Sequence, residues 1–309
     1  MEKVKAFAPA TVANVSCGFD ILGFALDSLG DHVILSKNDE KVLRVISIKG
    51  DGGRLPLEAD KNTCSIAIRA MLDDLGSDQG FDIELEKGLP LGSGMGSSAA
   101  SAVAALVAVN ELLGNPYPKN ELLPFAMEAE RAACGTAHAD NVAPSLLGGF
   151  VLIRGYKPLD VIKLSVPDNL TCTLLHPNYQ LNTSDSRSVL KDRIPLKDAI
   201  TQSGNVAGLV AGLFQSDYAL ISRSLEDVIA EPYRASLLPG FDEVKKAMLE
   251  LGALGLGISG SGPTLFILSE GKEKHEHFVQ KAKEIYDNLG LSLKAYFSRI
   301  NTKGGFVIQ

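Results

Sequence analysis

The sequence predicts an α+β protein built from two domains. The chain has 309 residues, which suits two domains of roughly 150 residues each. Residues that alternate between apolar and polar predict strands, whereas apolar residues three and four positions apart predict helices. Both patterns occur in runs, without the strict strand-helix alternation of a doubly wound parallel sheet. Hydrophobic residues make up 45% and charged residues 22% of the chain, as in an ordinary globular protein.

The first domain is predicted to cover residues 1–160. Its strands are expected at 3–7, 33–37, 42–49, 81–85 and 150–154. Its helices are expected at 62–75, 97–113 and 120–133. The polar, proline-containing stretch 155–168 is expected to form the hinge that leads to the second domain.

The second domain is predicted to cover residues 161–309. We expect strands at 170–176, 264–268, 292–299 and 305–308, and helices at 186–192, 195–214, 217–229, 241–251 and 273–289. The uncharged run 251–268 has the length of a membrane span, but five glycines and Pro263 interrupt it. We therefore expect a helix end, a glycine turn and a buried strand there, and no association with a membrane.

The most informative segment is the glycine-rich stretch 90–105, PLGSGMGSSAASAVAA, which follows a predicted strand and leads directly into a predicted helix. Glycine has no Cβ, so the backbone can turn sharply and bring its N–H groups close to phosphate oxygens. The helix that follows points its unpaired N–H groups and the positive end of its dipole at the same place. This order predicts a polyanion site. The alternative is a flexible surface loop ahead of a buried helix.

The residues of this loop exclude two other phosphate-binding motifs. A Walker A loop ends in Gly-Lys-Ser or Gly-Lys-Thr, and no lysine follows Gly94 or Gly96. A Rossmann turn has the spacing GxGxxG and an acidic residue about 20 positions further on, on the next strand. The sequence GSGMG has a different spacing, and Glu111 still lies within the predicted helix.

Three motifs resemble those of the GHMP kinases, the superfamily named for galactokinase, homoserine kinase, mevalonate kinase and phosphomevalonate kinase. APATVANVSCGFDILGFAL (8–26) resembles the first motif, PLGSGMGSSAA (90–100) the central one and GISGSGPTLFIL (257–268) the third. Met95 stands where the family usually has leucine, an apolar residue of similar volume. The resemblance implies a ribosomal-protein-like N-terminal domain, a ferredoxin-like C-terminal domain, an active site between them, and phosphoryl transfer from ATP with Mg²⁺.

Within the superfamily, four short segments are similar to the homoserine kinase pattern: ANVSCGFD (13–20), HADNVAPSLLGG (138–149), TSDSR (183–187) and the pair Tyr233-Arg234. The resemblance implies that the substrate is L-homoserine, phosphorylated on its side-chain hydroxyl on the route to threonine. One alternative is a related kinase that acts on a mevalonate-like or shikimate-like hydroxy acid. The other is a catalytically inactive ligand-binding regulator, which would be expected to lose glycines or metal ligands that this chain retains.

The resemblance also implies the nucleotide and metal sites. The expected ATP contacts are Asn62, Lys87, Pro90, Leu91, Gly92, Ser93, Gly94, Met95, Gly96, Ser97, Ser98, Ala99 and Ala100. Ser98 and Glu130 are expected to supply the protein ligands to Mg²⁺. Judged from the residues alone, Asn62 could be a plain helix N-cap. Glu130 could likewise belong to a solvated helix face with Glu128 and Arg131.

An amino-acid substrate needs an anion site and an ammonium site at a fixed separation. By resemblance, Arg187 and Arg234 hold the carboxylate, and arginine suits this role because its fork pairs bidentately. Asp20 and Asn14 are implied to bind the ammonium or hydroxyl end. The remaining implied substrate contacts are His138, Asn141, Thr183 and Gly260.

The implied catalytic residues are Asn141, Asp140 and Glu130. Asp140 stands where mevalonate kinases carry a catalytic aspartate, so it could accept the hydroxyl proton. A loose, metaphosphate-like transition state leaves little for a base to do, and the γ-phosphate itself can take the proton late. We therefore rank Asn141 as a substrate contact above Asp140 as a base. His138 either orients the substrate or is a structural histidine at the start of a loop.

The net charge and the cysteine content limit the binding partners and the cellular compartment that we expect for the protein. The formal net charge of −7 argues against nucleic acid or an acidic membrane surface as a partner. The four cysteines, at positions 17, 64, 134 and 172, form no CxxC pair, so we expect free thiols in a reducing compartment. No apolar stretch of signal-peptide length is visible, and we expect a cytoplasmic enzyme. The oligomeric state is open, with a homodimer as one possibility.

Overall fold

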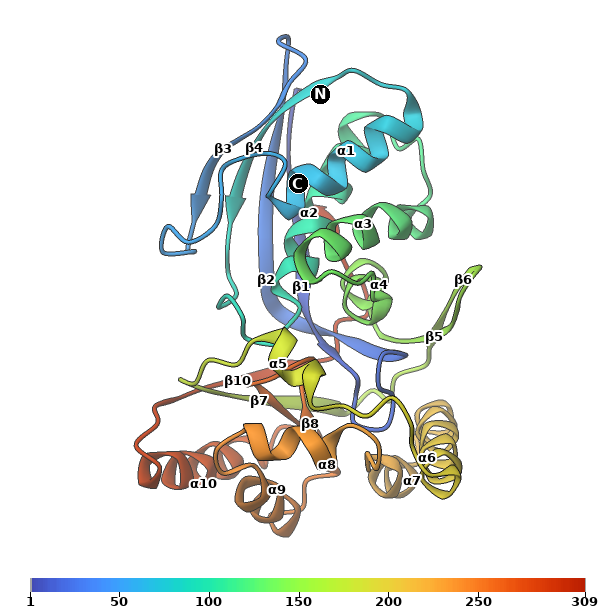
Figure 1. Cartoon of the computed structure of the whole chain (residues 1–309), viewed down its shortest axis with the longest axis vertical. Helices are drawn as coiled ribbons and strands as arrows, with labels where there is room; N and C mark the ends of the chain where they lie inside the picture. The colour runs from blue at the N-terminus through green and yellow to red at the C-terminus, as the bar shows by residue number, and fades with distance from the viewer. Residues whose placement is uncertain (1, 309) are drawn as a thin grey trace.

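The computed structural model describes residues 2–308, and it consists of two sheets with helices packed against them (Figure 1). In Figure 1 the first sheet lies in the upper part of the molecule and the second in the lower part. Helices and strands occur in runs in both parts, so the predicted α+β class is confirmed.

The first sheet comprises β1 (Lys3–Ala13), β2 (Leu22–Asn38), β3 (Leu43–Lys49), β4 (Gly80–Glu86), β5 (Phe150–Tyr156), β6 (Leu159–Leu164) and β11 (Phe306–Ile308). Its order is β11-β1-β2-β4-β3, and β5 joins β2 to β6. Only β3 and β4 pair in parallel within the described residues. β2 is long enough to pair with β5 along its first part and with β4 along its second.

The helices of the upper part are α1 (Thr63–Leu75), α2 (Ser97–Leu112), α3 (Leu123–Cys134), which follows the 3₁₀ turn η1 (Lys119–Leu122), and α4 (Ala139–Leu147). α2 is apolar on all sides, and a helix of this kind needs burial on all sides. It contacts β1 and β2 on one side and α1 and α3 on the other. The core therefore fixes the N-terminus of α2, where the glycine loop ends.

The second sheet comprises β7 (Leu170–Pro177), β8 (Gly255–Ile258), β9 (Leu265–Glu270) and β10 (Leu293–Arg299), in the order β10-β7-β9-β8. Its helices are α5 (Thr183–Ser188), α6 (Leu196–Gln215), α7 (Tyr218–Ser224), α8 (Glu231–Arg234), followed by η2 (Ala235–Leu237), α9 (Phe241–Glu250) and α10 (His275–Asn288). α9 and α10 lie beneath the sheet in Figure 1, and α5 lies above it, toward the upper part. α6 and α7 pack against each other at one side.

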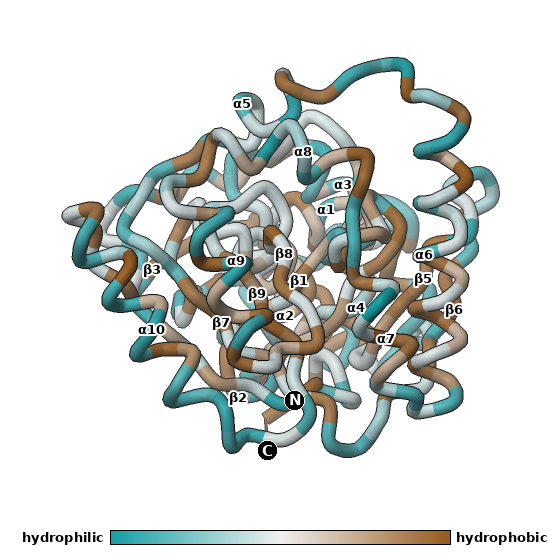
Figure 2. Tube along the Cα trace, turned by 90° about the horizontal axis from the view of Figure 1, so that it is seen from below, coloured by the Kyte–Doolittle hydropathy of each residue, from teal (hydrophilic) through white to brown (hydrophobic). Residues whose placement is uncertain are grey.

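The hydropathy of the chain follows this layering. In the view from below, hydrophobic segments gather in the middle, around β1, α2 and β7, while the outer turns of α10 are largely hydrophilic (Figure 2). The inner residues of α10, such as Phe278 and Tyr286, pack against the second sheet. No helix among residues 2–308 is long and apolar enough to cross a membrane.

The structure differs from the prediction at two places in the middle of the chain. Residues 155–164 do not form a hinge, because β5 and β6 make an antiparallel hairpin there. The first strand of the hairpin was expected at 150–154, but β6 was missed because its side chains are half-buried or exposed and give it no apolar face in the sequence. α4 was missed as well, since Pro144 inside it and the polar start at His138 are typical of a loop.

We propose to divide the chain after β6 rather than between residues 160 and 161. β6 spans that position and pairs with β5 in the first sheet. The chain also returns to the first sheet at its far end, where β11 pairs with residues 5–7 of β1. The second half of the sequence therefore contributes to both parts of the molecule.

Candidate active site

A cavity of about 400 Å³ lies where the two parts of the molecule meet. Its wall contains residues from all three motifs. The predicted site residues that line it are Asn14, Asp20, Asn62, Lys87, Leu91, Gly92, Ser93, Gly94, Gly96, Ser97, Ser98, Glu130, His138, Asp140, Asn141, Thr183, Arg187, Arg234 and Gly260. The fold thus brings together segments that are far apart in the sequence.

The glycine loop forms one wall of this cavity. Gly92, Gly94 and Gly96 have φ values of 67°, 76° and 65°, in the left-handed region that favours glycine. Gly96 is the N-cap of α2, and no side chain of residues 2–308 caps the helix there. The hydroxyls of Ser93 and Ser97 are buried, and neither has a hydrogen-bond partner within the described part of the chain. Such N–H and O–H donors at a helix N-terminus fit the oxygens of a polyphosphate.

Gly94 and Gly92 have different reasons to lack a side chain. A Cβ on Gly94 would lie 2.5 Å from the carbonyl oxygen of Ser259 and 2.7 Å from that of Gly262. This glycine is therefore required by the third motif, which packs against the loop. A Cβ on Gly92 would have no described atom within 4 Å. The sequence predicts close approach of phosphate as the reason for the glycines, but that reason does not account for Gly94.

Four of the predicted nucleotide contacts lie outside the cavity wall. Met95, Ala99 and Ala100 are fully buried and belong to the hydrophobic core. Pro90 lines a neighbouring cavity. A motif match marks the whole segment, whereas the structure separates residues that face the cavity from residues that anchor the loop.

Lys87, another predicted ATP contact, has its ammonium group inside the protein. Its side chain is 1% exposed, and it pairs with Asp31, whose side chain is fully buried. The same Nζ donates to the carbonyl oxygen of Ser97 at 2.9 Å and to Ser101 Oγ at 2.8 Å. An ammonium group has three protons, and these three partners use them all. Lys87 therefore holds the first turn of α2, which leaves no proton for adenine.

Asn62 is the N-cap of α1, as the simpler interpretation of the sequence holds. Its Oδ1 accepts a hydrogen bond from the backbone N–H of Cys64 at 3.0 Å, and its Nδ2 donates to the carbonyl oxygen of Pro56 at 3.1 Å. Leu55, Pro56 and Ile66 line the same end of the cavity. These three apolar side chains suit the flat face of a nucleobase.

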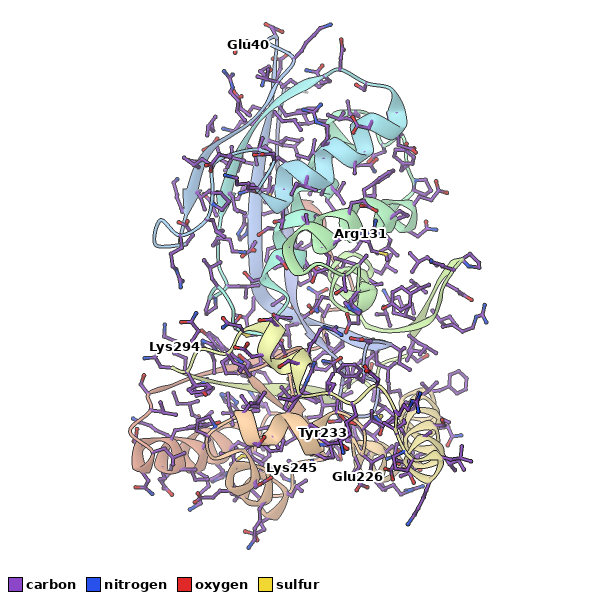
Figure 3. The ribbon with its side chains drawn as sticks, viewed as in Figure 1. Glu40, Arg131, Glu226, Tyr233, Lys245 and Lys294 are labelled. Atoms are coloured by element: carbon purple, nitrogen blue, oxygen red, sulfur yellow. The ribbon has the colours of Figure 1, made fainter. Side chains whose placement is uncertain are left out.

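Ser98 and Glu130, the predicted magnesium ligands, are adjacent. Ser98 Oγ donates to Glu130 Oε2 at 3.0 Å, and Glu130 is 8% exposed. Its neighbours Glu128 and Arg131 form an exposed ion pair on α3, where Figure 3 labels Arg131. Glu130 thus faces the cavity and does not belong to that solvated face. A carboxylate and a hydroxyl are hard oxygen donors, so this pair fits Mg²⁺, which takes one or two carboxylates together with substrate phosphates.

Asp20 and Arg187, which the resemblance assigns to opposite ends of the substrate, pair with each other. Arg187 Nη2 donates to Asp20 Oδ1 at 2.9 Å, and Nη1 donates to Oδ2 at 3.3 Å. His138 Nδ1 lies 3.6 Å from Asp20 Oδ1. The two paired side chains are 25% and 35% exposed, so a ligand can reach them. A zwitterion, which carries one charge of each sign, can exchange with such a pair.

Arg234 lines the cavity beside Arg187 but is 4% exposed. Its Nε donates to the carbonyl oxygen of Ser186 at 2.9 Å, and its Nη1 donates to that of Gly260 at 3.1 Å. Its guanidinium carbon lies 4.8 Å from the ring centroid of Phe19. Burial, and after it the charge of Arg187, lowers the pKa of Arg234 to about 10. Arg234 therefore joins α5 to the third motif as well as facing the cavity.

Asn14 shapes the first motif. Asn14, Val15 and Ser16 have φ values of 72°, 45° and 53°, a left-handed turn that costs of order 1–3 kcal/mol per residue. Asn14 Nδ2 donates to the carbonyl oxygen of Gly260 at 2.7 Å. Its Oδ1 accepts from the backbone N–H of Asp20 at 3.0 Å. The strained turn and its side chain tie the first motif to the third and fix the position of Asp20.

Asp140 and Asn141 lie at the start of α4. Asp140 is 3% exposed, and its Oδ1 has no hydrogen-bond partner among residues 2–308. Burial, and after it the charges of Asp20 and Glu130, raises the pKa of Asp140 to about 7. A pKa near neutral suits a group that accepts a proton during catalysis. Asn141 Oδ1 accepts from Thr11 Oγ1 at 2.7 Å, which fixes the orientation of its amide.

His138 and Thr183 complete the wall between the two parts. His138 is the N-cap of α4, and burial lowers its pKa, so the imidazole is neutral near pH 7. Its Nε2 is buried and lacks a partner in the described structure. Thr183 opens α5, and its Oγ1 lies 3.3 Å from Ser261 Oγ of the third motif. Both side chains can offer hydrogen bonds to a polar substrate.

Part of the cavity wall was not predicted from the sequence. The residues of the wall that were not predicted are Ala13, Leu55, Pro56, Lys61, Thr63, Ile66, Leu85, Ser101, Ala132, Ala133, Thr136 and Ser261. Asp31, the partner of Lys87, was also missed. The sequence did indicate that Asp31 is buried, because it shares one face of β2 with the buried residues Val33 and Leu35. A carboxylate on a core face needs a buried partner.

The protein families that the chain matches agree with a site for phosphoryl transfer. The family profile described as GHMP kinases N terminal domain matches residues 62–149, and the profile described as GHMP kinases C terminal matches residues 209–288. A homoserine kinase of Chlorobium phaeobacteroides (strain DSM 266 / SMG 266 / 2430) is 53% identical over 296 residues, which cover 93% of this chain and 92% of the relative. A homoserine kinase of Chloroherpeton thalassium is 49% identical over 319 residues, with 100% of both chains covered.

Solved structures agree with these relatives. The crystal structure of homoserine kinase from Cytophaga hutchinsonii ATCC 33406 superposes with a TM-score of 0.96 at 55% identity, covering 100% of this chain and 98% of that one. A mevalonate kinase of Methanococcus jannaschii has a TM-score of 0.71 at 16% identity, covering 96% and 98%. At that identity the likeness shows the shared fold alone.

The two-part fold, the glycine loop and the matched profiles define the chain as a GHMP kinase, an ATP-dependent phosphotransferase. The relatives that share about half of its residues over nearly its whole length place it more narrowly. The chain belongs to the homoserine kinase family.

Proposed function

We propose that this kinase transfers the γ-phosphoryl group of ATP to the side-chain hydroxyl of L-homoserine and forms O-phospho-L-homoserine. One observation carries the proposal: a single cavity holds both a polyphosphate cradle and an acid-arginine pair suited to a zwitterion. The names of the relatives agree with this substrate.

On the phosphate side, the backbone of the glycine loop and the hydroxyls of Ser93 and Ser97 bind phosphate oxygens. Lys87 and Asp31 hold the first turn of α2 beneath them. Ser98 and Glu130 would hold Mg²⁺, which when bound neutralises charge on the β- and γ-phosphate oxygens. The protein thus supplies a rigid frame in which the polyphosphate has one orientation.

On the amino-acid side, the substrate takes the place of the internal ion pair. Its carboxylate binds Arg187 and Arg234, and its ammonium group binds Asp20. One pair of opposite charges replaces another, so no charge is left without a partner in the bound state. A hydroxy acid without an ammonium group would leave Asp20 unpaired, and this disfavours mevalonate-like substrates.

In the transfer step, the hydroxyl oxygen forms a bond to the γ-phosphorus while the bond from that phosphorus to the bridging oxygen of ADP breaks. Asn141, oriented by Thr11, holds the hydroxyl group. The hydroxyl proton passes to Asp140, whose pKa of about 7 lets it be ionised at the start of the reaction. Because the transition state is loose, most of the rate enhancement comes from positioning and charge neutralisation.

The test is a coupled assay of ADP release with L-homoserine, mevalonate, shikimate and galactose at equal concentrations. We expect kcat/KM for L-homoserine to exceed the others by at least about a hundredfold, and EDTA to abolish the signal, since phosphoryl transfer from ATP needs the metal. A preference for mevalonate or shikimate would overturn the amino-acid substrate while leaving the kinase assignment intact. No ADP release above the rate without acceptor would favour an inactive regulator.

We also propose that two copies of the chain associate through α6. Leu196 and Phe214, at the two ends of this helix, are each 77% exposed, and Ile200 is 64% exposed. Large apolar side chains exposed along the length of one helix mark an interaction surface. Light scattering should give the molar mass of a dimer for the wild type and that of a monomer for Phe214→Glu. A monomeric wild type would contradict this proposal.

The proposed compartment is the cytoplasm. Cys17, Cys64 and Cys172 are buried free thiols, as expected of a protein from a reducing environment. Burial raises the pKa of Cys17 and Cys64 to about 12, so these thiols are unreactive near neutral pH. Cell fractionation with an antibody to the chain tests the location.

A further inference from the structure

A second cavity, of about 780 Å³, opens beside the active site. Arg54 and residues 90–92 of the glycine loop line it from the upper part of the molecule. The end of β7, the segment that leads into α5, and β10 line it from the lower part. Figure 3 labels Lys294 of β10 there, near the level where the two parts meet. Thr183 and Arg187 line both cavities, so the two spaces adjoin.

The wall of the second cavity is cationic. Arg54, Arg187 and Lys294 carry permanent positive charges. Burial, and after it the charge of Lys294, lowers the pKa of His176, so its imidazole adds no charge near neutral pH. No aspartate or glutamate occurs among the sixteen described residues that line it. This composition contrasts with the whole chain, in which 37 acidic residues outnumber 30 basic ones. The wall is therefore selective for an anion.

The uncharged part of the wall is rich in hydrogen-bonding groups. These side chains belong to Asn178, Tyr179, Gln180, Asn182, Thr183, Ser184 and Ser292. Two of them, Asn182 and Ser184, already donate to the carboxylate of Asp185, at 3.0 Å and 3.4 Å. Arg54 and Lys294 are exposed, so an incoming anion can reach them, whereas Arg187 already shares its charge with Asp20. Amide, hydroxyl and cationic groups together suit a ligand with several negatively charged oxygens, such as a phosphate ester.

We propose that this second cavity binds a phosphate monoester of a small amino acid. The proposal rests on the proposed function, because it concerns the chemical class of that reaction's product. Phosphorylation adds about −1.5 to −2 charges at neutral pH to a zwitterion whose own charges cancel. The product therefore carries a net negative charge that the substrate lacks, and cationic side chains bind it more strongly than they bind the substrate. It meets Arg54 and Lys294 directly beyond Arg187.

Such a ligand contacts both parts of the molecule at once. Arg54 belongs to the loop between β3 and α1, and Lys294 belongs to β10 of the second sheet. An anion bound between them holds the two parts together next to the glycine loop. We expect it to slow the exchange of ligands in the active cavity. The phosphorylated product should thus inhibit turnover even when both substrates are saturating.

The experiment uses O-phospho-L-serine as the probe and L-serine as its control without phosphate. The active cavity is first filled with ADP, Mg²⁺ and L-homoserine, and binding is then followed by calorimetry. We expect one equivalent of O-phospho-L-serine to bind and L-serine not to bind. In steady-state assays the probe should lower kcat at saturating ATP and L-homoserine.

Single variants locate the site. Arg54→Gln and Lys294→Gln should each weaken binding of the probe about fivefold, the size expected of an exposed ionic contact. Without the probe, both variants should keep the wild-type kcat, the wild-type KM for L-homoserine and the wild-type melting temperature. Lys246→Gln makes the same charge change at a 79% exposed lysine on α9, outside both cavities, and should bind the probe like the wild type.

Three results would overturn the proposal. Inhibition that excess L-homoserine relieves, or loss of binding once the active cavity is filled, would place the phosphate in the active site. Equal weakening by Lys246→Gln would show a general effect of charge. The proposed function fails separately: a chain that releases no ADP with L-homoserine, yet binds the probe through Arg54 and Lys294, would retain the anion site.

Discussion

The phosphate side and the amino-acid side of the active cavity are built in different ways. The phosphate side uses the backbone, namely glycines in the left-handed region and a helix N-terminus. The buried ion pair of Lys87 and Asp31 supports this backbone from beneath. The amino-acid side uses charged side chains. Asp20 and Arg187 are partly exposed and neutralise each other.

This difference separates a preformed site from one that must rearrange. The charged groups under the glycine loop have their full set of partners, so nucleotide binding separates none of them. On the other side, a substrate must break the bidentate contact between Arg187 and Asp20 before it gains its own. Variants of the first side should therefore act on stability and turnover, and variants of the second on the KM of the amino acid.

The largest effect is expected from Lys87→Met. The change leaves Asp31 charged and fully buried without its partner, which should lower the free energy of unfolding by about 3–5 kcal/mol. Lys87→Met combined with Asp31→Leu should recover most of the loss, because an apolar pair has no charge to bury. Urea denaturation of the wild type, both single variants and the double variant measures the effect. Normal stability with a raised KM for ATP would instead make Lys87 a nucleotide contact.

Glu130→Gln should lower kcat by an order of magnitude or more. Glutamine keeps an acceptor for the hydroxyl of Ser98 but lacks the negative charge that a metal ligand supplies. The measurement is turnover at saturating Mg²⁺, together with the melting temperature, which should change little. Glu128→Gln, on the exposed face of the same helix, is the matched control and should keep wild-type turnover. Unchanged turnover in Glu130→Gln would refute the metal assignment.

Arg187→Leu tests the amino-acid side. We expect the KM for L-homoserine to rise at least tenfold, or about 1.4 kcal/mol, with the KM for ATP nearly unchanged. Arg187→Lys should recover only part of the loss, because a point charge cannot reproduce the fork. Arg187 is a cleaner probe than Arg234, because removal of Arg234 would also take the Nε donor from the carbonyl oxygen of Ser186 and leave that of Gly260 with Asn14 alone. Equal increases in both KM values would indicate a defect in folding instead.

A change at Asp140 should alter stability in a way that depends on pH. The folded-state pKa of about 7 lies above the ordinary aspartate value of about 3.9. Between these values the folded state binds a proton that the unfolded state does not, so stability falls as the pH rises through the window. Asp140→Asn should therefore melt a few degrees above the wild type at pH 8 and together with it near pH 4. A difference that is the same at both pH values would show that Asp140 does not titrate there.

The glycine loop could be predicted from sequence because its chemistry lies in consecutive residues. Left-handed φ values at Gly92, Gly94 and Gly96 are a local property, and so is the helix that begins at Ser97. Charge partners are not local. Lys87 and Asp31 are 56 positions apart, and Arg187 and Asp20 are 167 apart. Their pairing depends on how β2, β4 and α5 meet, which no local pattern encodes.

The same distinction holds for the fold. α1 and β4 were predicted to within about one residue, because each has one clear apolar face. β6 and α4 were missed because a strand of half-buried and exposed residues and a helix with an internal proline show neither period. The strand conformation of β6 depends on its pairing with β5, and the helical conformation of α4 depends on its packing in the core. Such tertiary contacts override the local preference of the sequence.

The return of β11 to the first sheet has a consequence for a chain cut by a protease. Cleavage in the connection between β6 and β7 would leave two fragments that still share a sheet, since β11 stays paired with residues 5–7 of β1. A nicked molecule should elute as one species from a sizing column in buffer and separate in denaturant. A fragment that ends after β6 would instead bare the outer edge of β1, and such an edge recruits other strands and promotes aggregation.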